Sequence, residues 1–139
     1  MAGSGTTGCS PEAFEALKTS LWCFMEKEIY PTETEYMRQC HEMGATGSEW
    51  THPPILIDLM YKAKSRGLWN LFLPIDSAKA AGTTIGKLGY GLTNRQYAEI
   101  CEILGTSTPV EYAAQATNCG NPDTGNMEVS PSLDPTGAH

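Results

Sequence analysis

The residues nearest to a phosphate-binding loop are Gly82, Gly86 and Lys87, in the stretch AGTTIGKL. Such a loop needs four residues between its glycines, so that backbone N–H groups surround the phosphate, and a hydroxyl residue after the lysine to bind magnesium. Here three residues separate the glycines, and Leu88 replaces the hydroxyl. The overlapping stretch GKLGYG reverses the glycine order of a dinucleotide-binding loop. Neither stretch therefore indicates nucleotide binding.

Two pairs of side chains could transfer protons. Cys40 and His41 could form a thiolate–imidazole pair, but neighbours on a helix point about 100° apart and hydrogen-bond poorly. A surface histidine is the better interpretation. Glu33 and Glu35 could be the acid and base of a glycosidase, which needs a shaped cleft between the two carboxylates. The sequence gives no sign of a cleft, so solvated charges are predicted.

Cysteines are the usual starting point for a metal or disulfide site, and this chain has five, widely separated: Cys9, Cys23, Cys40, Cys101 and Cys119. They form no C-x-x-C pair and have no histidine at zinc-finger spacing. We expect reduced, mostly buried thiols and no metal, because a free cysteine behaves as a small hydrophobe. The tryptophans are likewise predicted to pack in the protein rather than to stack on a ligand: Trp22, Trp50 and Trp69.

Length and charge limit the class of protein. The 139 residues suffice for one domain with a core, and the formal net charge is −7. The lysines and arginines are scattered, so no nucleic-acid partner is expected. No apolar run reaches the roughly 18 residues of a transmembrane helix, and no targeting signal is visible. Gly, Ser, Thr and Pro predict mobile tails at 1–10 and 130–139, around one domain at 11–129.

Helical signals dominate the first half of the chain. Ser10 and Pro11 predict a helix start, and a stripe spaced three to four residues apart follows: Phe14, Leu17, Leu21, Phe24, Met25 and Ile29. Pro31 should end or kink this helix, and Gly44 should close its polar continuation. A third helix is expected from Pro53–Pro54 to Gly67, with an apolar stripe of its own: Ile55, Leu56, Leu59, Met60 and Ala63.

The second half begins with the segment LWNLFLP, which is too short for a helix and is predicted to cross the core in an extended form. A long surface loop rich in glycine should follow. Capping boxes at Thr93–Gln96 and Thr108–Glu111 predict two more helices. Asp123 or Thr124 would cap a last one, interrupted at Ser130–Pro131. The fold class is therefore all-α, an orthogonal or up-down bundle of about five to six helices.

Three stretches carry a family resemblance: PPILIDLMYKAKSRGLWNLFLP, GLTNRQYAEICEILGTS and NCGNPDTGNMEV. Together they resemble the amino-terminal helical domain of the acyl-CoA dehydrogenases, in the branch of family members ten and eleven. The resemblance extends from about Phe14 to Val129, and the run PDTGNME is its most specific part. The stretch SAKAAGTTIGKLGY departs from the family by being longer than the usual glycine-rich link.

The resemblance implies a three-part enzyme with helical, β and carboxyl-terminal helical domains, assembled as dimers or tetramers around FAD. In that family a glutamate removes the α-proton of an acyl-CoA thioester while a hydride passes from the β-carbon to the flavin. This chain stops before the β-domain and the catalytic base, so it is expected to be inactive and to bind no FAD alone. A mitochondrial or peroxisomal location is implied by the same resemblance.

The resemblance also implies that the helix beginning near Pro109 covers one wall of the acyl cavity. Matching along it places Tyr112, Gln115 and Cys119 toward the acyl chain; ordinary packing between helices is the competing interpretation. A second function stays open, a non-catalytic helical module that binds a dehydrogenase subunit or another partner. An exposed apolar patch around Ala113, Ala116 and Met127 would indicate an isolated dehydrogenase domain instead.

Overall fold

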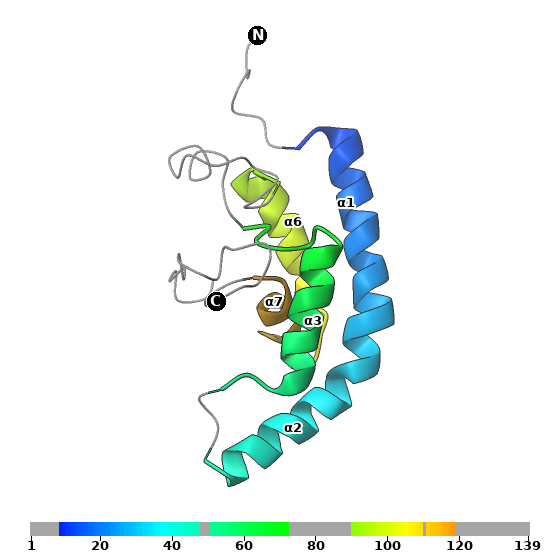
Figure 1. The fold of residues 1–139 in the computed structure, drawn as a ribbon. Coiled ribbons are helices and arrows are strands. Elements are labelled where there is room, and N and C mark those ends of the chain that lie inside the picture. The colour runs from blue at the N-terminus through cyan, green and yellow to red at the C-terminus, as the bar shows by residue number, and fades with distance from the viewer. Residues whose placement is uncertain (1–8, 48–50, 73–89, 110, 119–139) are drawn as a thin grey trace.

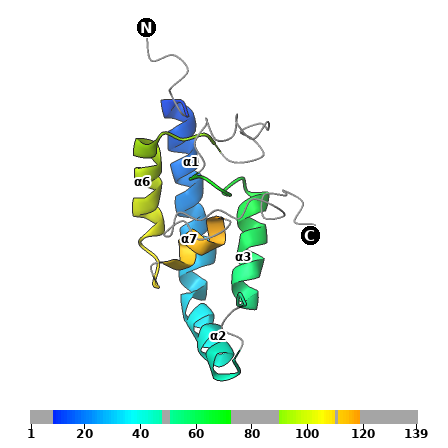
Figure 2. The same ribbon diagram turned by 90° about the vertical axis from the view of Figure 1, so that its left-hand side faces the viewer.

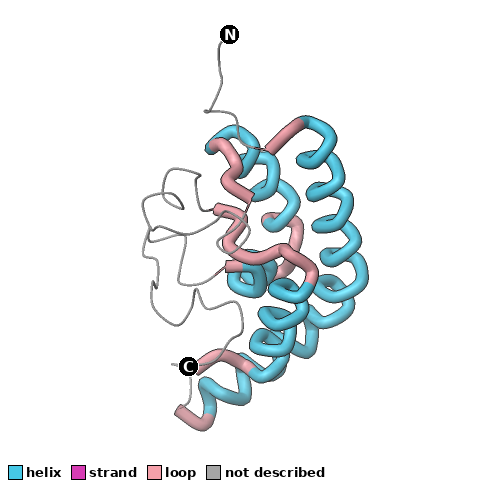
Figure 3. The backbone as a smooth tube through the Cα atoms, turned by 45° about the horizontal axis from the view of Figure 1, so that its top comes forward, coloured by secondary structure: helices cyan, strands magenta, loops and turns pink. Residues whose placement is uncertain are grey.

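A computed structural model of the chain describes residues 9–47, 51–72, 90–109 and 111–118. The described residues are helical and include no strand, which confirms the all-α class (Figure 3). Helices α1 and α2 form a long bent rod, and α3 and α6 run beside α1 with the short α7 between them (Figures 1 and 2). The loop that contains Gly82 and Lys87, and the helix expected at Asp123, lie outside the described residues.

Helix α1, Pro11–Phe24, forms as its sequence predicts. Ser10 Oγ accepts the N–H of Ala13 at 3.2 Å, which satisfies one of the free amides of the first turn. The whole predicted stripe is buried: Phe14, Leu17, Leu21, Phe24, Met25 and Ile29. The backbone of Cys9, just before the helix, is bound at both its N–H and its C=O by the Gln96 side chain.

Pro31 bends the rod without ending it. The chain passes from α1 through a π-helical turn at Met25–Ile29 and a 3₁₀ turn at Tyr30–Thr32 into α2, Glu33–Ala45. Changes of helical pitch of this kind commonly accommodate a proline. Thr32 Oγ lies 2.6 Å from the carbonyl oxygen of Glu28 and supplies an extra donor beside the proline, which has none. The predicted kink is therefore confirmed.

Helix α2 is mostly exposed, and Tyr36 is its buried residue. It ends at Ala45, one residue after the predicted Gly44. The glycine that makes the following turn is Gly47, whose φ of 78° a side chain would rarely adopt. The turn is therefore three residues later than predicted.

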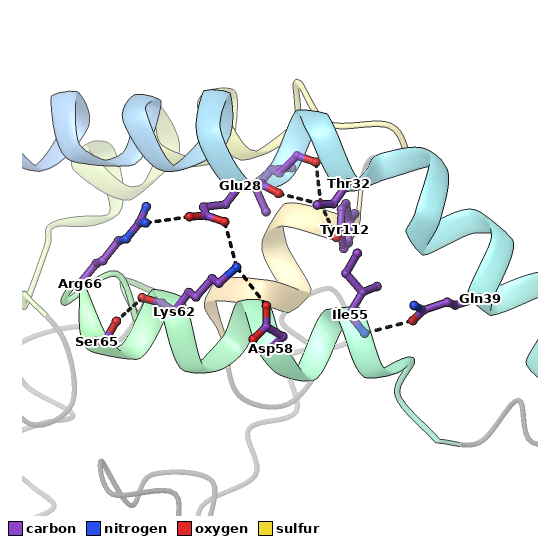
Figure 4. A network of polar contacts seen from close by, with 10 residues as sticks. Glu28, Thr32, Gln39, Ile55, Asp58, Lys62, Ser65, Arg66 and Tyr112 are labelled. Atoms are coloured by element: carbon purple, nitrogen blue, oxygen red, sulfur yellow. Dashed lines mark hydrogen bonds and ion pairs between the residues drawn. The ribbon is translucent and has the colours of Figure 1, made fainter.

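Helix α3, Pro54–Ser65, buries Leu56, Leu59 and Ala63 and turns at Gly67 with φ 72°. Its start and end agree with the prediction. Pro53 has no side chain that can cap the helix, so the cap comes from α2: Gln39 Oε1 accepts the N–H of Ile55 at 3.0 Å (Figure 4). The sequence could not show this bond, because the two residues are 16 positions apart.

The segment after α3 crosses the core as predicted, but it turns at Leu71 and Phe72 instead of staying extended. Leu68, Asn70 and Leu71 are all buried. Asn70 has a left-handed φ of 56°, and its N–H donates to the carbonyl oxygen of Thr117 at 2.8 Å. An asparagine tolerates this backbone conformation better than most residues. The segment thus connects α3 to the end of α7.

Helix α6, Asn94–Leu104, begins with the capping box predicted at Thr93 and Gln96. Gln96 Oε1 accepts the N–H of Thr93 at 3.1 Å and also that of Cys9, so one side chain joins α6 to the start of α1. Lys18 and Glu99 add an ion pair at 2.9 Å between the same two helices. Ile100, Ile103 and Leu104 complete the core on this side.

The capping box predicted at Thr108–Glu111 is wrong. Glu111 is the first residue of α7, Glu111–Thr117, rather than the third. The N–H of Thr108 donates to Glu33 Oε1 at 2.8 Å, so a carboxylate from α2 takes the bond that Glu111 was expected to form. Ser107 Oγ accepts from the N–H of Ala113 at 3.3 Å and satisfies a donor of the first turn.

Two predictions about burial also need correction. Cys23 and Cys101 are exposed and Cys9 and Cys40 are half-buried, so the prediction of mostly buried thiols is wrong for the described cysteines. Trp22 is 41% exposed and is not a packing residue. His41 is exposed as expected.

None of the described helices has the length and apolar character of a transmembrane segment. The same residues contain no group of histidine, cysteine or carboxylate side chains that could hold a metal ion.

We expect Gln39→Ala to lower the free energy of unfolding by about 1 kcal/mol, because it removes the acceptor at the start of α3. Urea unfolding followed by circular dichroism measures this. Thr34→Ala is the control, since Thr34 is an exposed residue of the same helix. Equal stabilities for the two variants would show that the Gln39–Ile55 bond contributes nothing.

Candidate functional site at the end of helix α7

Helix α7 lies at the centre of the bundle, in contact with α3, α6 and the π-helical turn. Ala113 and Ala116 have no exposed surface, and their small side chains allow the neighbouring backbones to approach closely. The exposed apolar patch expected at these two alanines is therefore wrong, because other elements of the chain cover them. Met127, the third residue of that patch, lies outside the described residues.

Tyr112 packs within the core. Its ring stacks on Tyr36 with centroids 4.1 Å apart. Its hydroxyl lies 2.8 Å from Thr32 Oγ, as Figure 4 shows. Burial raises the pKa of the Tyr112 phenol, so it remains neutral near pH 7. Thr32 donates its only hydroxyl proton to a carbonyl at the bend, so Tyr112 is the donor in the bond between them.

Gln115 has a different position. Its side chain is half-buried, beside the half-buried Ala114, while the other faces of α7 are buried. Gln115 is thus a polar side chain on the less covered side of the helix. Tyr112 is thus buried and Gln115 half-buried on α7, and Cys119 lies outside the described residues.

The loop before α7 is held by side chains from the bend. Glu33 accepts from the N–H of Thr108, Tyr30 hydrogen-bonds the hydroxyl of Thr106, and Thr32 accepts from Tyr112. Glu33 is thus half-buried and bound to the loop, rather than simply a solvated charge as predicted. Glu35 is bound by Arg38, and these hydrogen bonds hold the pKa of its carboxyl at about 2. Neither carboxylate is available as a catalytic acid or base.

A second polar network joins the bend to α3 (Figure 4). Glu28, whose side chain is 17% exposed, accepts from Arg66 at 2.7 Å and from Lys62 at 3.1 Å. Lys62 also pairs with Asp58 at 3.0 Å, and hydrogen bonds to both acids raise the pKa of its ammonium. Each charged side chain of the network is paired with one of opposite charge, so the network stabilises the packing of the bend against α3. Sequence analysis missed it because Glu28 lies more than 30 positions before its partners.

Buried polar groups gather where α7 ends. Asn118 is 1% exposed, and its Nδ2 donates to the carbonyl oxygen of Ala114 at 2.8 Å. Its Oδ1 is buried and has no hydrogen-bond partner among the described residues. The same is true of the indole nitrogen of Trp69, which precedes Asn70 in the segment bound to Thr117. The sequence analysis did not predict this cluster, because no spacing along the chain indicates that Trp69 and Asn118 lie on either side of one backbone hydrogen bond.

The described residues do not by themselves fit FAD. A dinucleotide cofactor needs cations or free backbone N–H groups around its two phosphates. Of the seven described lysines and arginines, four are bound to carboxylates: Lys18, Arg38, Lys62 and Arg66. The other three, Lys27, Lys64 and Arg95, lie on three different helical elements. No reaction step through flavin can therefore be assigned to this part of the chain.

Comparison of the sequence with known proteins finds relatives of this chain. The chain is 43% identical over 122 residues to acyl-CoA dehydrogenase family member 10 of Mus musculus, covering 88% of this chain and 10% of the relative. The chain is homologous to part of the acyl-CoA dehydrogenases. It is also 41% identical over 128 residues to the probable acyl-CoA dehydrogenase IBR3 of Arabidopsis thaliana, covering 81% of the chain and 15% of that protein.

A bacterial protein also matches the chain. The probable acyl-CoA dehydrogenase FadE2 of Mycobacterium tuberculosis is 40% identical over 112 residues, which cover 81% of this chain and 23% of FadE2. The chain thus spans less than a quarter of the length of these relatives. No protein-family model matches it, and no solved structure matches it significantly.

We expect Tyr112→Phe to lower the free energy of unfolding by about 1 kcal/mol, because the ring stacking remains and one buried hydrogen bond is lost. Tyr112→Ala should cost about 3–5 kcal/mol, since it also leaves a cavity. Thermal unfolding of the purified chain distinguishes the two variants. A Tyr112→Ala protein as stable as the wild type would show that this side chain is not part of the core.

Proposed function

We propose that this chain is the amino-terminal helical domain of an FAD-dependent acyl-CoA dehydrogenase and forms one wall of the acyl cavity. The observation that carries the proposal is the 43% identity to a dehydrogenase across 88% of the chain. The proposed reaction is α,β-dehydrogenation of an acyl-CoA thioester. FAD, when bound, would accept the hydride, and the polypeptide that surrounds this domain in a complete enzyme would hold the flavin.

The role proposed for this chain is to position a rigid wall. Helix α7 is held by Thr32, Tyr36 and Glu33 from the rod and by contacts with α3. Gln115 on this helix, and Cys119 after its end, would face the acyl chain, and Tyr112 would contribute by holding the helix in place. A fixed wall matters because a cavity discriminates acyl chains through close contact along their length.

A second function, a non-catalytic helical module that binds another protein, has one observation in its favour. The small residues of α7 that an isolated domain was expected to expose are fully buried, at Ala113 and Ala116. The described helices thus close their own core without help from another domain. A module of this kind would fold alone and would not restore dehydrogenase activity to any enzyme.

A chimera tests the proposal. The matched 122-residue segment of the mouse relative is replaced by this chain. We expect the chimera to bind FAD and to lose its flavin absorbance when an acyl-CoA is added, whereas the isolated chain stays colourless with FAD. A soluble chimera that does not reduce its flavin, or a yellow isolated chain, would contradict the proposal. The unaltered mouse protein serves as the reference.

Within the chimera, Gln115→Phe tests the wall. A larger side chain that projects into the cavity should lower kcat/KM for long acyl-CoA substrates by roughly tenfold relative to short ones. Steady-state rates over a series of chain lengths measure this ratio. Ser20→Ala is the control, since Ser20 is exposed on α1, far along the chain from α7. An unchanged ratio would place Gln115 outside the cavity.

A further inference from the structure

Three residues at the bend of the rod each hydrogen-bond one residue of the loop before α7 or of α7 itself. The pairs are Tyr30 with Thr106, Thr32 with Tyr112, and Glu33 with Thr108. Figure 4 shows the second of these pairs. The partners lie 75 to 80 positions apart in the chain, and all six are described residues. We call these three pairs the bend contacts.

The direction of each bend contact is fixed by its neighbours. Thr106 Oγ donates its one proton to the carbonyl oxygen of Ile103 at 2.7 Å, so Tyr30 is the donor in the bond with Thr106. Thr32 also donates to a carbonyl and accepts from Tyr112. The third contact joins a carboxylate to a backbone N–H and can run in one direction only. None of the three can be replaced by its reverse.

The start of α7 depends on these contacts because the helix does not fix its own position. Glu111 is the first residue of the helix, so the capping box expected from Thr108 does not form. A helix of seven residues is also too short to be stable alone. The groups that bind the preceding loop therefore determine where α7 begins.

Two of the bend contacts lie near the surface. Thr106 and Thr108 are exposed, and their partners Tyr30 and Glu33 are half-buried. A hydrogen bond at the surface replaces bonds to water and adds little net stability, but it still restricts the direction and distance of its two groups. These two contacts therefore contribute to the placement of α7 more than to the free energy of unfolding.

We propose that Glu33 and Tyr30 are positioning residues for the acyl cavity. Through Thr108 and Thr106 they fix where α7 begins, and so they set which acyl chains fit, although neither touches the substrate. This inference rests on the proposed function, in which α7 is a wall of that cavity. A wall whose position varies distinguishes less sharply between acyl lengths, because discrimination depends on close contact.

The chimera described above tests Glu33. Glu33→Ala should reduce the ratio of kcat/KM between the best and the poorest acyl length by roughly threefold. The change should appear in KM rather than in kcat, because Glu33 is remote from the reacting atoms. Glu33→Gln should keep the wild-type ratio, since its amide oxygen still accepts the N–H of Thr108. Glu42→Ala is the matched control: it removes the same charge from α2, where Glu42 is 65% exposed and pairs with Arg38.

Tyr30→Phe tests the second contact and can be measured even if Glu33→Ala does not fold. It keeps the ring, removes the hydroxyl that binds Thr106, and should narrow the same ratio. Tyr61→Phe is its control, since Tyr61 is 54% exposed on α3.

An unchanged ratio in both Glu33→Ala and Tyr30→Phe would contradict the proposal. So would a loss of kcat by one common factor at every acyl length, which indicates a merely structural role. An equal effect of Glu33→Gln and Glu33→Ala would show that the bond to Thr108 is not the cause. If the unsubstituted chimera does not reduce its flavin, the proposed function fails, and this inference fails with it.

Amide hydrogen exchange in the isolated chain gives a second readout that needs no enzyme activity. Glu33→Ala should speed exchange at the amides of Thr108 and Ala113 by roughly fivefold, the equivalent of one hydrogen bond. The amide of Leu21, in the middle of α1, should keep its rate, and Glu33→Gln should leave all three unchanged. Unaltered exchange at both Thr108 and Ala113 would show that Glu33 does not position α7, whatever the chimera does.

Discussion

Pro31 has no backbone N–H, and the arrangement of the described helices depends on how the rod accommodates that missing donor. The rod widens into a π-helical turn, tightens into a 3₁₀ turn and continues as α2. Thr32 bonds the carbonyl of Glu28 at this point and receives the hydroxyl of Tyr112. The same bend thus sets the direction of α2 and fixes α7 against it.

Several further contacts converge on this bend. Glu28 joins it to α3 through Lys62 and Arg66, while Tyr30 and Glu33 hold the loop that leads into α7. Most of these bonds join polar groups that remain partly exposed to water. Such bonds contribute direction more than net free energy, because the water they displace had bonded the same groups. Burial of the apolar stripes of α1, α3 and α6 supplies the larger stabilising contribution.

The centre of the bundle explains how a seven-residue helix can be stable. Isolated helices of that length do not form in water, because nucleation costs more than a few backbone bonds return. Helix α7 forms because Tyr112, Ala113 and Ala116 are enclosed by α3, α6 and the bend. Two buried polar groups, the indole nitrogen of Trp69 and Oδ1 of Asn118, have no hydrogen-bond partner among the described residues.

The sequence by itself determined the all-α class, the apolar stripes of α1 and α3, the capping box at Thr93 and the homology to acyl-CoA dehydrogenases. These features depend on residues within about one or two helical turns of one another, or on the order of the residues alone. Only the tertiary structure decided that Gln39 caps α3, that Glu33 replaces Glu111 as the partner of Thr108, and that Ala113 and Ala116 are buried. Those contacts join residues far apart in the chain, and no periodic pattern within a helix specifies which distant side chain will meet it.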